Sequence, residues 1–378
     1  MEPSCPHCDA HIAPSELQRH VNYHFEDRWN LINEPHTALP NASENKLHNQ
    51  ASNLISCQTK SPCHRVKEGG IMRLLLKALK DEASRGSKFL TRTTFLCGNV
   101  DHFYSLESQD MGWGCGWRNI QMLSSHLLLT RASARATLFG GCGFVPDIPY
   151  LQRWLEIAWE RGFDTEGSLH FNKSICGFEH LIGTTECAAL FRSFGFRAKI
   201  VDFCVPEFES SVLSVPGPTK GQRNLAPVYG PMDMFVNRKS SLNTRNTKVH
   251  RFHKLFEWIW TYFSEDHLKQ IDCNSKVIMT AKSPLYFQHD GHSRTIVGIQ
   301  MKKRKAMKPV FDLLILDPGH KTDLIESSLA ENVGWEKLLK RGIHTLNKPQ
   351  YQLCYIDEGM ADHLEMENLK TIDSVLIQ

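Results

Sequence analysis

The sequence predicts an α+β fold, because segments with helical hydrophobic spacing mostly come first along the chain and strand-like segments follow. Apolar residues recur at helical intervals in four segments, 120–129, 150–161, 186–194 and 255–263. Strand-like patterns occur at 197–203, 277–279, 285–287, 293–300, 311–316 and 352–356. Helices followed by strands in this order are typical of an α+β domain.

The composition is that of an ordinary globular chain. Of its 378 residues, 41% are hydrophobic and 22% are charged, and the net charge is +3. A charge so close to neutral argues against nucleic acid as the primary partner. No apolar run reaches about 18 residues, so no membrane span is expected. The 12 cysteines are scattered and no secretory signal precedes them, which predicts reduced thiols in the cytosol and nucleus.

The first 25 residues contain a zinc-finger pattern. Cys5, Cys8, His20 and His24 follow the spacing C-x2-C-x11-H-x3-H, which suits tetrahedral zinc bound by two thiolates and two imidazoles. We therefore expect a C2H2-type finger over residues 1–25, with zinc in a structural role. Its helical part carries few basic or amide side chains, so protein binding is favoured over DNA reading.

The rest of the chain divides by composition. Residues 26–67 are rich in Asn, Ser, His and Pro and predict a flexible linker, and 205–251 predicts a flexible insertion. The main domain is expected at 68–378 and opens with a helical arm at 68–95. Within that arm, 71–83 has the pattern of an amphipathic helix. Packing on the main core is the favoured interpretation of this helix, and binding of a partner protein is the alternative.

Cys115 is the candidate nucleophile. It lies in the stretch MGWGCGWRN at 111–119, between two glycines that permit a tight turn, and a buried helix pattern follows at once. A thiol at a helix N-terminus faces the positive end of the helix dipole, which favours the thiolate, the form that attacks carbonyls. Such a nucleophile also needs a base and an orienting group within hydrogen-bond reach.

A hairpin in the second half of the chain supplies both groups. The strands 293–300 and 311–316 flank a basic segment, and a turn centred there pairs residue 298 with residue 311. The same register places His292 opposite Asp317. Neighbours across an antiparallel pair have Cβ atoms about 5 Å apart, a workable distance for a His–Asp hydrogen bond. His292 is therefore predicted as the base and Asp317 as the group that orients it.

Two other histidines and two glutamines compete for roles. His320 follows Asp317 closely and serves as the base if the turn folds back, whereas His289 is better suited to a supporting position. The Cys115 backbone N–H supplies one donor for an oxyanion hole. Gln288 is the first choice for the second donor, and Gln109 is the alternative.

With these residues in place, the chain resembles the zinc-finger-containing ubiquitin peptidases, relatives of the ubiquitin-fold-modifier-specific proteases. The resemblance rests on the stretches MGWGCGWRNIQML, VPDIPYLQRWLEIAWERGFD, GTTECAALFRSFGFRAKIVDF, QHDGHSRTIVGI and LLILDPGH. It implies a papain-like fold, with nucleophile Cys115, base His292, acid Asp317 and oxyanion residue Gln288. It also implies a deubiquitinating thiol isopeptidase that acts on ubiquitin and polyubiquitin chains, in particular the extended lysine-linked chains used in signalling.

Two alternatives differ from this reading in function. One is a protease for another ubiquitin-like modifier. The modifier-specific relatives take their histidine from an Asp-Pro-His motif, whereas here Gly319 separates Pro318 from His320 and the GHSRT motif at 291–295 is intact. That difference favours the ubiquitin branch. The other alternative is a non-catalytic adaptor that binds ubiquitin, against which the presence of all the proposed catalytic residues argues.

Overall fold

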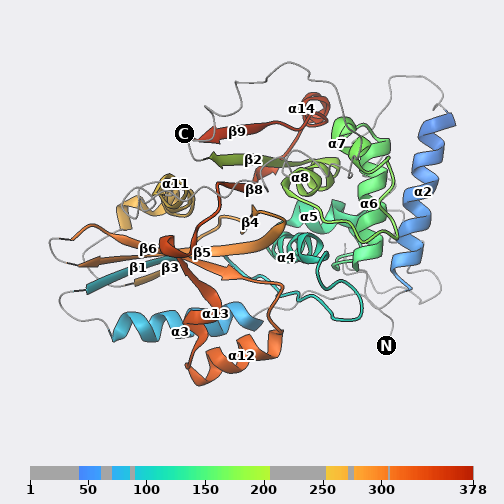
Figure 1. Ribbon diagram of the computed structural model, residues 1–378. Helices are drawn as coiled ribbons and strands as arrows, with labels where there is room; N and C mark the ends of the chain where they lie inside the picture. Colours follow the sequence, from blue (N-terminus) through green and yellow to red (C-terminus); the bar gives the residue numbers. More distant parts are fainter. Residues whose placement is uncertain are drawn as a thin grey trace, which may run out of the picture.

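The computed structural model describes residues 42–60, 70–85, 90–204, 253–270, 276–304 and 307–377. These residues form a mixed sheet, with helices packed against its faces and gathered at one end of it (Figure 1). The predicted α+β class is therefore confirmed. The expected zinc finger at 1–25 and the expected insertion at 205–251 lie outside the described residues.

Nine strands of the described residues form one sheet. They are β1 (Leu90–Leu96), β2 (Phe196–Cys204), β3 (Lys276–Met279), β4 (Leu285–His289), β5 (His292–Arg304), β6 (Val310–Leu316), β7 (Lys340–Gly342), β8 (Gln350–Met360) and β9 (Ser374–Ile377). Their order is β3-β1-β5-β4-β8-β2-β9, and β6 pairs with β5 and β7. Because β5 is long, β4 and β1 lie one after the other along one of its edges, and β6 runs along the opposite edge.

The helices surround this sheet. They are α2 (Ala42–Gln58), α3 (Gly70–Ser84), α4 (Cys115–Thr130), α5 (Ala132–Thr137), α6 (Ile148–Glu160), α7 (Thr165–His170), α8 (Thr184–Ser193), α11 (His253–Ser264), α12 (Thr322–Glu331), α13 (Trp335–Leu339) and α14 (His363–Asn368). In Figure 1, α3, α12 and α13 lie on one side of β1, β5 and β6, and α11 lies on the other. Among the helices described, none is long and apolar enough to cross a membrane.

Helix α4 is the central helix of the domain. Every residue from Gly116 to Leu128 is buried, and the helix contacts β4, β5, α5 and α6. Its polar side chains are therefore enclosed and must find partners inside the protein. At Gly116 a Cβ atom would lie 2.5 Å from Ile182 Cγ1 and 2.9 Å from Tyr286 Oη, so only glycine allows this close approach.

The prediction of a linker over residues 26–67 is wrong for residues 42–58, which form α2. This helix packs on α6, and its Ala51, Leu54 and Ile55 are buried in the common core. Gln58 at its end donates to the carbonyl of Phe139 at 2.7 Å and accepts from Trp154 Nε1 at 3.0 Å. A polar composition concealed α2, because only one face of the helix is apolar.

The segment predicted as a helical arm at 68–95 contains both a helix and a strand. Helix α3 buries Ile71, Leu75 and Leu79 in the core, which confirms the packing interpretation. Residues 90–95, however, belong to β1 and not to a helix. Strand β1 pairs with the far half of β5, including Lys302 and Arg304, so these basic residues are strand residues rather than a turn.

This pairing also shifts the register of the β5–β6 hairpin. Gly298 pairs with Leu314 and not with Phe311, and an irregularity between Ile296 and Gly298 then moves the register by one residue. Thr295 consequently faces Leu316. The predicted placement of His292 opposite Asp317 is therefore wrong by two residues. The physical reason is that β5 extends to Arg304 because β1, a strand that the sequence pattern did not predict, holds it in the sheet.

Candidate active site

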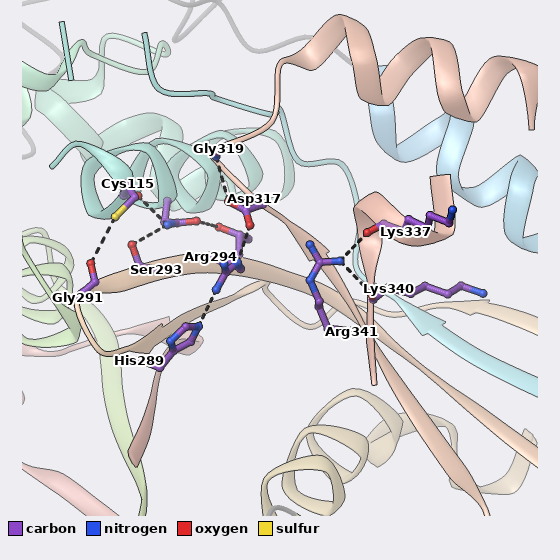
Figure 2. Close-up of polar contacts among 12 residues, drawn as sticks. Cys115, His289, Gly291, Ser293, Arg294, Asp317, Gly319, Lys337, Lys340 and Arg341 are labelled. Carbon is purple, nitrogen blue, oxygen red and sulfur yellow. Dashed lines mark hydrogen bonds and ion pairs between the residues drawn. The ribbon is translucent and has the colours of Figure 1, made fainter. Parts of the chain in front are cut away.

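Cys115 is the first residue of α4, as the sequence predicts. Its thiol is partly exposed, and Sγ lies 3.9 Å from the carbonyl oxygen of Gly291, at the tip of the β4–β5 hairpin (Figure 2). Gly291 immediately precedes His292 in the chain. The fold thus brings the candidate nucleophile next to the segment that carries the candidate base, although the two are separated by more than 170 residues in sequence.

The turn before Cys115 is braced by a buried ion pair. Arg118 Nε and Nη2 lie 3.0 and 2.8 Å from the two carboxylate oxygens of Asp110, a bidentate arrangement with both side chains buried. Asp110 also accepts from the backbone N–H of Leu106 at 2.9 Å. A Cβ atom at Gly114 would overlap the Asp110 carboxylate, so this glycine is required by its neighbour. These contacts fix the entry of the chain into α4.

Asn119 connects α4, the helix that begins with Cys115, to strand β5. Its Nδ2 donates to the carbonyl of Cys115 at 2.7 Å and to Ser293 Oγ at 3.0 Å, and its Oδ1 accepts from Thr295 Oγ1 at 2.7 Å. The side chain is fully buried. Ser293 and Thr295 lie on either side of Arg294, so this face of β5 is tied to the first turn of α4.

The hairpin tip is a two-residue turn. Asp290 and Gly291 have φ values of 44° and 73°, and His289 and His292 close the turn as a strand pair. Positive φ at both central residues is characteristic of a type I′ hairpin turn, for which Asp-Gly is a preferred sequence. Lys348 Nζ lies 2.5 Å from Asp290 Oδ2 and anchors the tip from outside. The Gly291 carbonyl therefore has a defined position beside the thiol.

His292 is exposed, and its ring lies 6.0 Å from the ring of His289 on the same face of the hairpin. His289 has a different environment, because Arg294 Nη1 lies 2.6 Å from its Nε2. A guanidinium only donates, so Nε2 of His289 accepts. Burial, and after it the charge of Arg294, lower the pKa of His289 to about 4. His289 is thus a neutral acceptor, and its Nε2 lone pair is already engaged.

Asp317 follows β6 and is held from two sides. Arg294 Nε lies 2.6 Å from Oδ2, and the Gly319 N–H donates to Oδ1 at 3.0 Å. Burial by itself raises the pKa of this carboxyl, but the Arg294 guanidinium and the Gly319 N–H outweigh it and hold the pKa below its ordinary value. His320 lies close to Asp317, since its backbone N–H donates to the Asp317 carbonyl at 3.1 Å.

Gln288, the predicted oxyanion residue, lies on β4 in the same hairpin as His292. Its Oε1 accepts from the backbone N–H of Thr184 at 2.9 Å, at the start of α8. A Cβ atom at Gly183 would lie 2.7 Å from Oε1 and 3.0 Å from Nε2, so the amide lies flat against this glycine. Because Oε1 accepts from Thr184, the donor group Nε2 takes no part in this hydrogen bond. Gln109, the alternative, is exposed in the turn before Cys115.

Two residues of this region were not identified from the sequence: Asn119 and Arg294. Asn119 gave one signal, a polar residue four positions after Cys115 in a largely apolar helix. Arg294 gave none, because its partners depend on the hairpin register. No group of three or more His, Cys, Asp or Glu side chains suited to a metal ion occurs within the ranges that the structure describes. The proposed zinc ligands lie outside those ranges.

A partly exposed cysteine that begins a buried helix, with a histidine-bearing hairpin against its thiol, defines a candidate thiol peptidase with an α+β fold. Residues 90–354 match the model of peptidase family C78, and the chain belongs to this family. The family relationship inferred from the motifs is thereby confirmed.

The curated relatives carry ubiquitin in their names. Zinc finger-containing ubiquitin peptidase 1 of Bos taurus is 31% identical over 295 residues, which cover 78% of this chain and 41% of that protein. The Homo sapiens protein of the same name is 30% identical over 302 residues, covering 79% and 42%. Ubiquitin carboxyl-terminal hydrolase mug105 of Schizosaccharomyces pombe is 38% identical over 263 residues, covering 70% and 82%. The chain thus spans less than half the length of the mammalian proteins.

Proposed function

We propose that this chain is a cysteine-type deubiquitinase with a papain-like catalytic domain. The observation that carries the proposal is the contact of the Cys115 thiol with the carbonyl of Gly291, the residue before His292. The family relationship and the names of the relatives supply the substrate class. The bond cleaved is the isopeptide bond between the C-terminal glycine of ubiquitin and a lysine side chain.

In the proposed mechanism, His292 takes the proton from Cys115, and the thiolate attacks the carbonyl carbon of that glycine. The backbone N–H of Cys115 and Nε2 of Gln288 stabilise the oxyanion. His292 then returns the proton to the lysine amine, which leaves, and the ubiquitin acyl group remains on Cys115. A water molecule gives a proton to His292 and attacks this thioester. The C–S bond breaks, the Cys115 thiolate takes the proton from His292, and ubiquitin is released with a free C-terminal carboxylate.

Asp317 is the proposed orienting acid for His292. Each carboxylate oxygen has two lone pairs, and the contacts of Asp317 with Arg294 and Gly319 use one on each oxygen. A second lone pair therefore stays free to accept the imidazole N–H. His289 is a weaker candidate for the base because Arg294 occupies its Nε2. Trp117 is fully buried and serves packing, whereas Trp113 is only partly buried and is the tryptophan suited to border the substrate channel.

We further propose a preference for extended, lysine-linked chains, together with zinc held by Cys5, Cys8, His20 and His24. Both proposals rest on the sequence resemblance and on the ligand spacing. A finger in the same chain as the catalytic domain would supply a second contact for a second ubiquitin, and linked contacts raise the effective concentration of the chain. Zinc content of the purified protein before and after a Cys5→Ser, Cys8→Ser change tests the metal directly.

The proposed activity is tested with ubiquitin that carries a C-terminal electrophile, by measuring the intact mass of the protein after incubation. We expect one ubiquitin adduct, which disappears in Cys115→Ala and persists in Cys176→Ala, a change at a cysteine that is more exposed than Cys115. A parallel reaction with the ubiquitin-fold modifier distinguishes the substrate. An adduct with that modifier alone would reassign the enzyme, and no adduct with either modifier or with a two-ubiquitin probe would favour an inert adaptor.

A further inference from the structure

Arg294 lies between two groups of the candidate site and contacts both of them. Nε lies 2.6 Å from Oδ2 of Asp317, and Nη1 lies 2.6 Å from Nε2 of His289 (Figure 2). The side chain of Arg294 is only 24% exposed. Its two contacts point in different directions from one planar group, so the guanidinium is held at both ends.

The backbone of Asp317 is already fixed without Arg294. The Asp317 carbonyl lies 3.1 Å from His102 Nε2, and Nδ1 of His102 lies 3.0 Å from Thr322 Oγ1. The Gly319 N–H binds one carboxylate oxygen. These backbone contacts do not fix the side-chain torsion angles that orient the carboxylate. The contact of Arg294 with the second carboxylate oxygen restricts those angles. Together, Gly319 and Arg294 engage one lone pair on each oxygen and leave the others in a defined direction.

The far end of Arg294 is held by a neutral group. His289 accepts from Nη1, and with a pKa of about 4, lowered by its burial and by Arg294, it stays uncharged at neutral pH. Lysine in place of arginine would keep the positive charge near Asp317 but would not bond both acceptors in this fork-like geometry. The arrangement His289–Arg294–Asp317 therefore depends on the shape of the guanidinium as well as on its charge.

We infer that Arg294 is a positioning residue, which aims the Asp317 carboxylate so that it orients the histidine base. This inference rests on the proposed function, because it gives Arg294 a role through Asp317. Arg294 does not need to contact the substrate in this role. The strand pairing supports it. Thr295 pairs with Leu316, the last residue of β6, so Asp317, which follows, lies across from Arg294 and contacts it.

The test is a double-mutant cycle measured with ubiquitin that carries a C-terminal fluorogenic amide. Arg294→Met is expected to lower kcat roughly ten- to a hundredfold, the loss associated with a hydrogen bond to a charged group, with KM changed less than about twofold. Arg294→Lys is expected to recover part of this loss. In the Asp317→Asn background, Arg294→Met should have little further effect on kcat, because the two residues act as one unit.

Arg131→Met is the matched control. Arg131 lies at the other end of α4 and donates to the carbonyls of Asp357 and Ile356, so its loss should lower the melting temperature with kcat unchanged. An effect of Arg294→Met on kcat that is as large in the Asp317→Asn background as in the native chain would overturn the inference. An increase in kcat would also overturn it, because Arg294 would then hold Asp317 away from the base.

A second readout separates this inference from the proposed activity. The rate at which iodoacetamide alkylates Cys115 at neutral pH, followed by mass spectrometry, needs no ubiquitin. We expect Arg294→Met and Asp317→Asn to slow the alkylation of Cys115 to a similar extent, with no added effect when combined. If the native chain fails to cleave ubiquitin but this pattern holds, the substrate assignment fails and the role of Arg294 stands. If the alkylation rate of Cys115 is unchanged by both variants, the positioning role is wrong.

Discussion

Asn119 donates a hydrogen bond of 3.0 Å to Ser293, and this bond links the helix that begins with Cys115 to the strand that begins with His292. The same amide contacts the Cys115 carbonyl at 2.7 Å. A single buried side chain therefore spans the two elements whose relative position decides whether the proposed nucleophile and the proposed base meet. The Asn119 amide makes three hydrogen bonds, all inside the protein, so substitutions at this residue are expected to lower the stability of the fold.

Asn119→Ala is expected to lower the free energy of unfolding by about 1–3 kcal/mol, because Ser293, Thr295 and the Cys115 carbonyl lose a buried partner. Urea titration measures this change. The labelling rate of Cys115 by the ubiquitin electrophile should fall as well. Asn347→Ala, at an exposed position, is the control. A loss of unfolding free energy no greater than that of the control would mean that the hydrogen bonds of the Asn119 side chain contribute nothing to stability.

Gly116→Ala is expected to destabilise the protein by about 1–3 kcal/mol, since the added methyl group would meet Ile182 and Tyr286 at distances that force a shift. The thiol of Cys115 would move away from Gly291 with the first turn of α4. The matched change is Gly98→Ala, whose Cβ atom would have its nearest neighbour, His126 Cε1, at an ordinary 3.5 Å. Equal melting temperatures for the two variants would contradict the expectation.

Breaking the buried pair of Asp110 and Arg118 is expected to cost about 3–5 kcal/mol for either single change, Asp110→Leu or Arg118→Met, because one charge is left buried and unpaired. The double variant should cost clearly less than the two single losses combined. Unfolding in urea supplies the three values. Glu367→Ala, which removes the exposed pair with Lys370, should be nearly silent. Additive losses in the double variant would argue against direct coupling.

Ile55→Ala is expected to lower the free energy of unfolding by roughly 2–5 kcal/mol, because Ile55 is buried against the loop at Gly140. The prediction tests whether α2 is an integral part of the domain. Asn53→Ala, at an exposed position on the same helix, serves as the comparison. If both variants unfold at the same urea concentration as the native chain, α2 contributes no stability to the rest of the domain.

Stability is expected to fall as the pH is lowered from about 6.5 towards 4. Burial lowers the pKa of His102 and of His126 from 6.5 to about 4 in the folded protein. The unfolded chain therefore takes up protons at these residues in a pH range where the folded chain does not, and the stability present above pH 6.5 is lost below it. Each histidine should cost on the order of 1–2 kcal/mol by about pH 5.

Urea unfolding at a series of pH values measures this slope. In His126→Gln the decline between about pH 6.5 and 5 should be shallower than in the native chain, whatever the absolute stability of the variant. Parallel curves for the two proteins would show that His126 does not contribute to the pH dependence.

Most helices and strands follow from local patterns. The segments around 120–129, 150–161, 186–194 and 255–263 become α4, α6, α8 and α11, because their apolar spacing matches the helical repeat. The α-helices and strands that these patterns did not predict are α2, α5, α7, α12, α13, α14, β1, β7 and β9. Two of them show why. Helix α2 has a narrow apolar face in a polar composition. Strand β1 falls within the segment predicted as a helical arm, and its place in the sheet depends on pairing with β5, more than 200 residues away.

The candidate site divides in the same way. Cys115 was identified from its glycine-flanked position before a buried helix, and the structure places it at the start of α4. The relationship of His292 to Asp317 was not obtained correctly, since it required a hairpin register. A shift of two residues brought Arg294 to Asp317 instead. Registers are specified by all the strands of a sheet together, and a pattern within one strand carries little of that information.

The sequence by itself determined the α+β class and the family, and it predicted Cys115 as the nucleophile and the hairpin proposed to carry the base, because each of these depends on residues close together in the chain. The tertiary structure decided the contact of Cys115 with Gly291, the tie through Asn119, and the pairing of Arg294 with Asp317. These contacts join α4, β5 and the turn after β6. Distances between such elements are set by the packing of the whole core, where a shift of one strand changes which side chains meet.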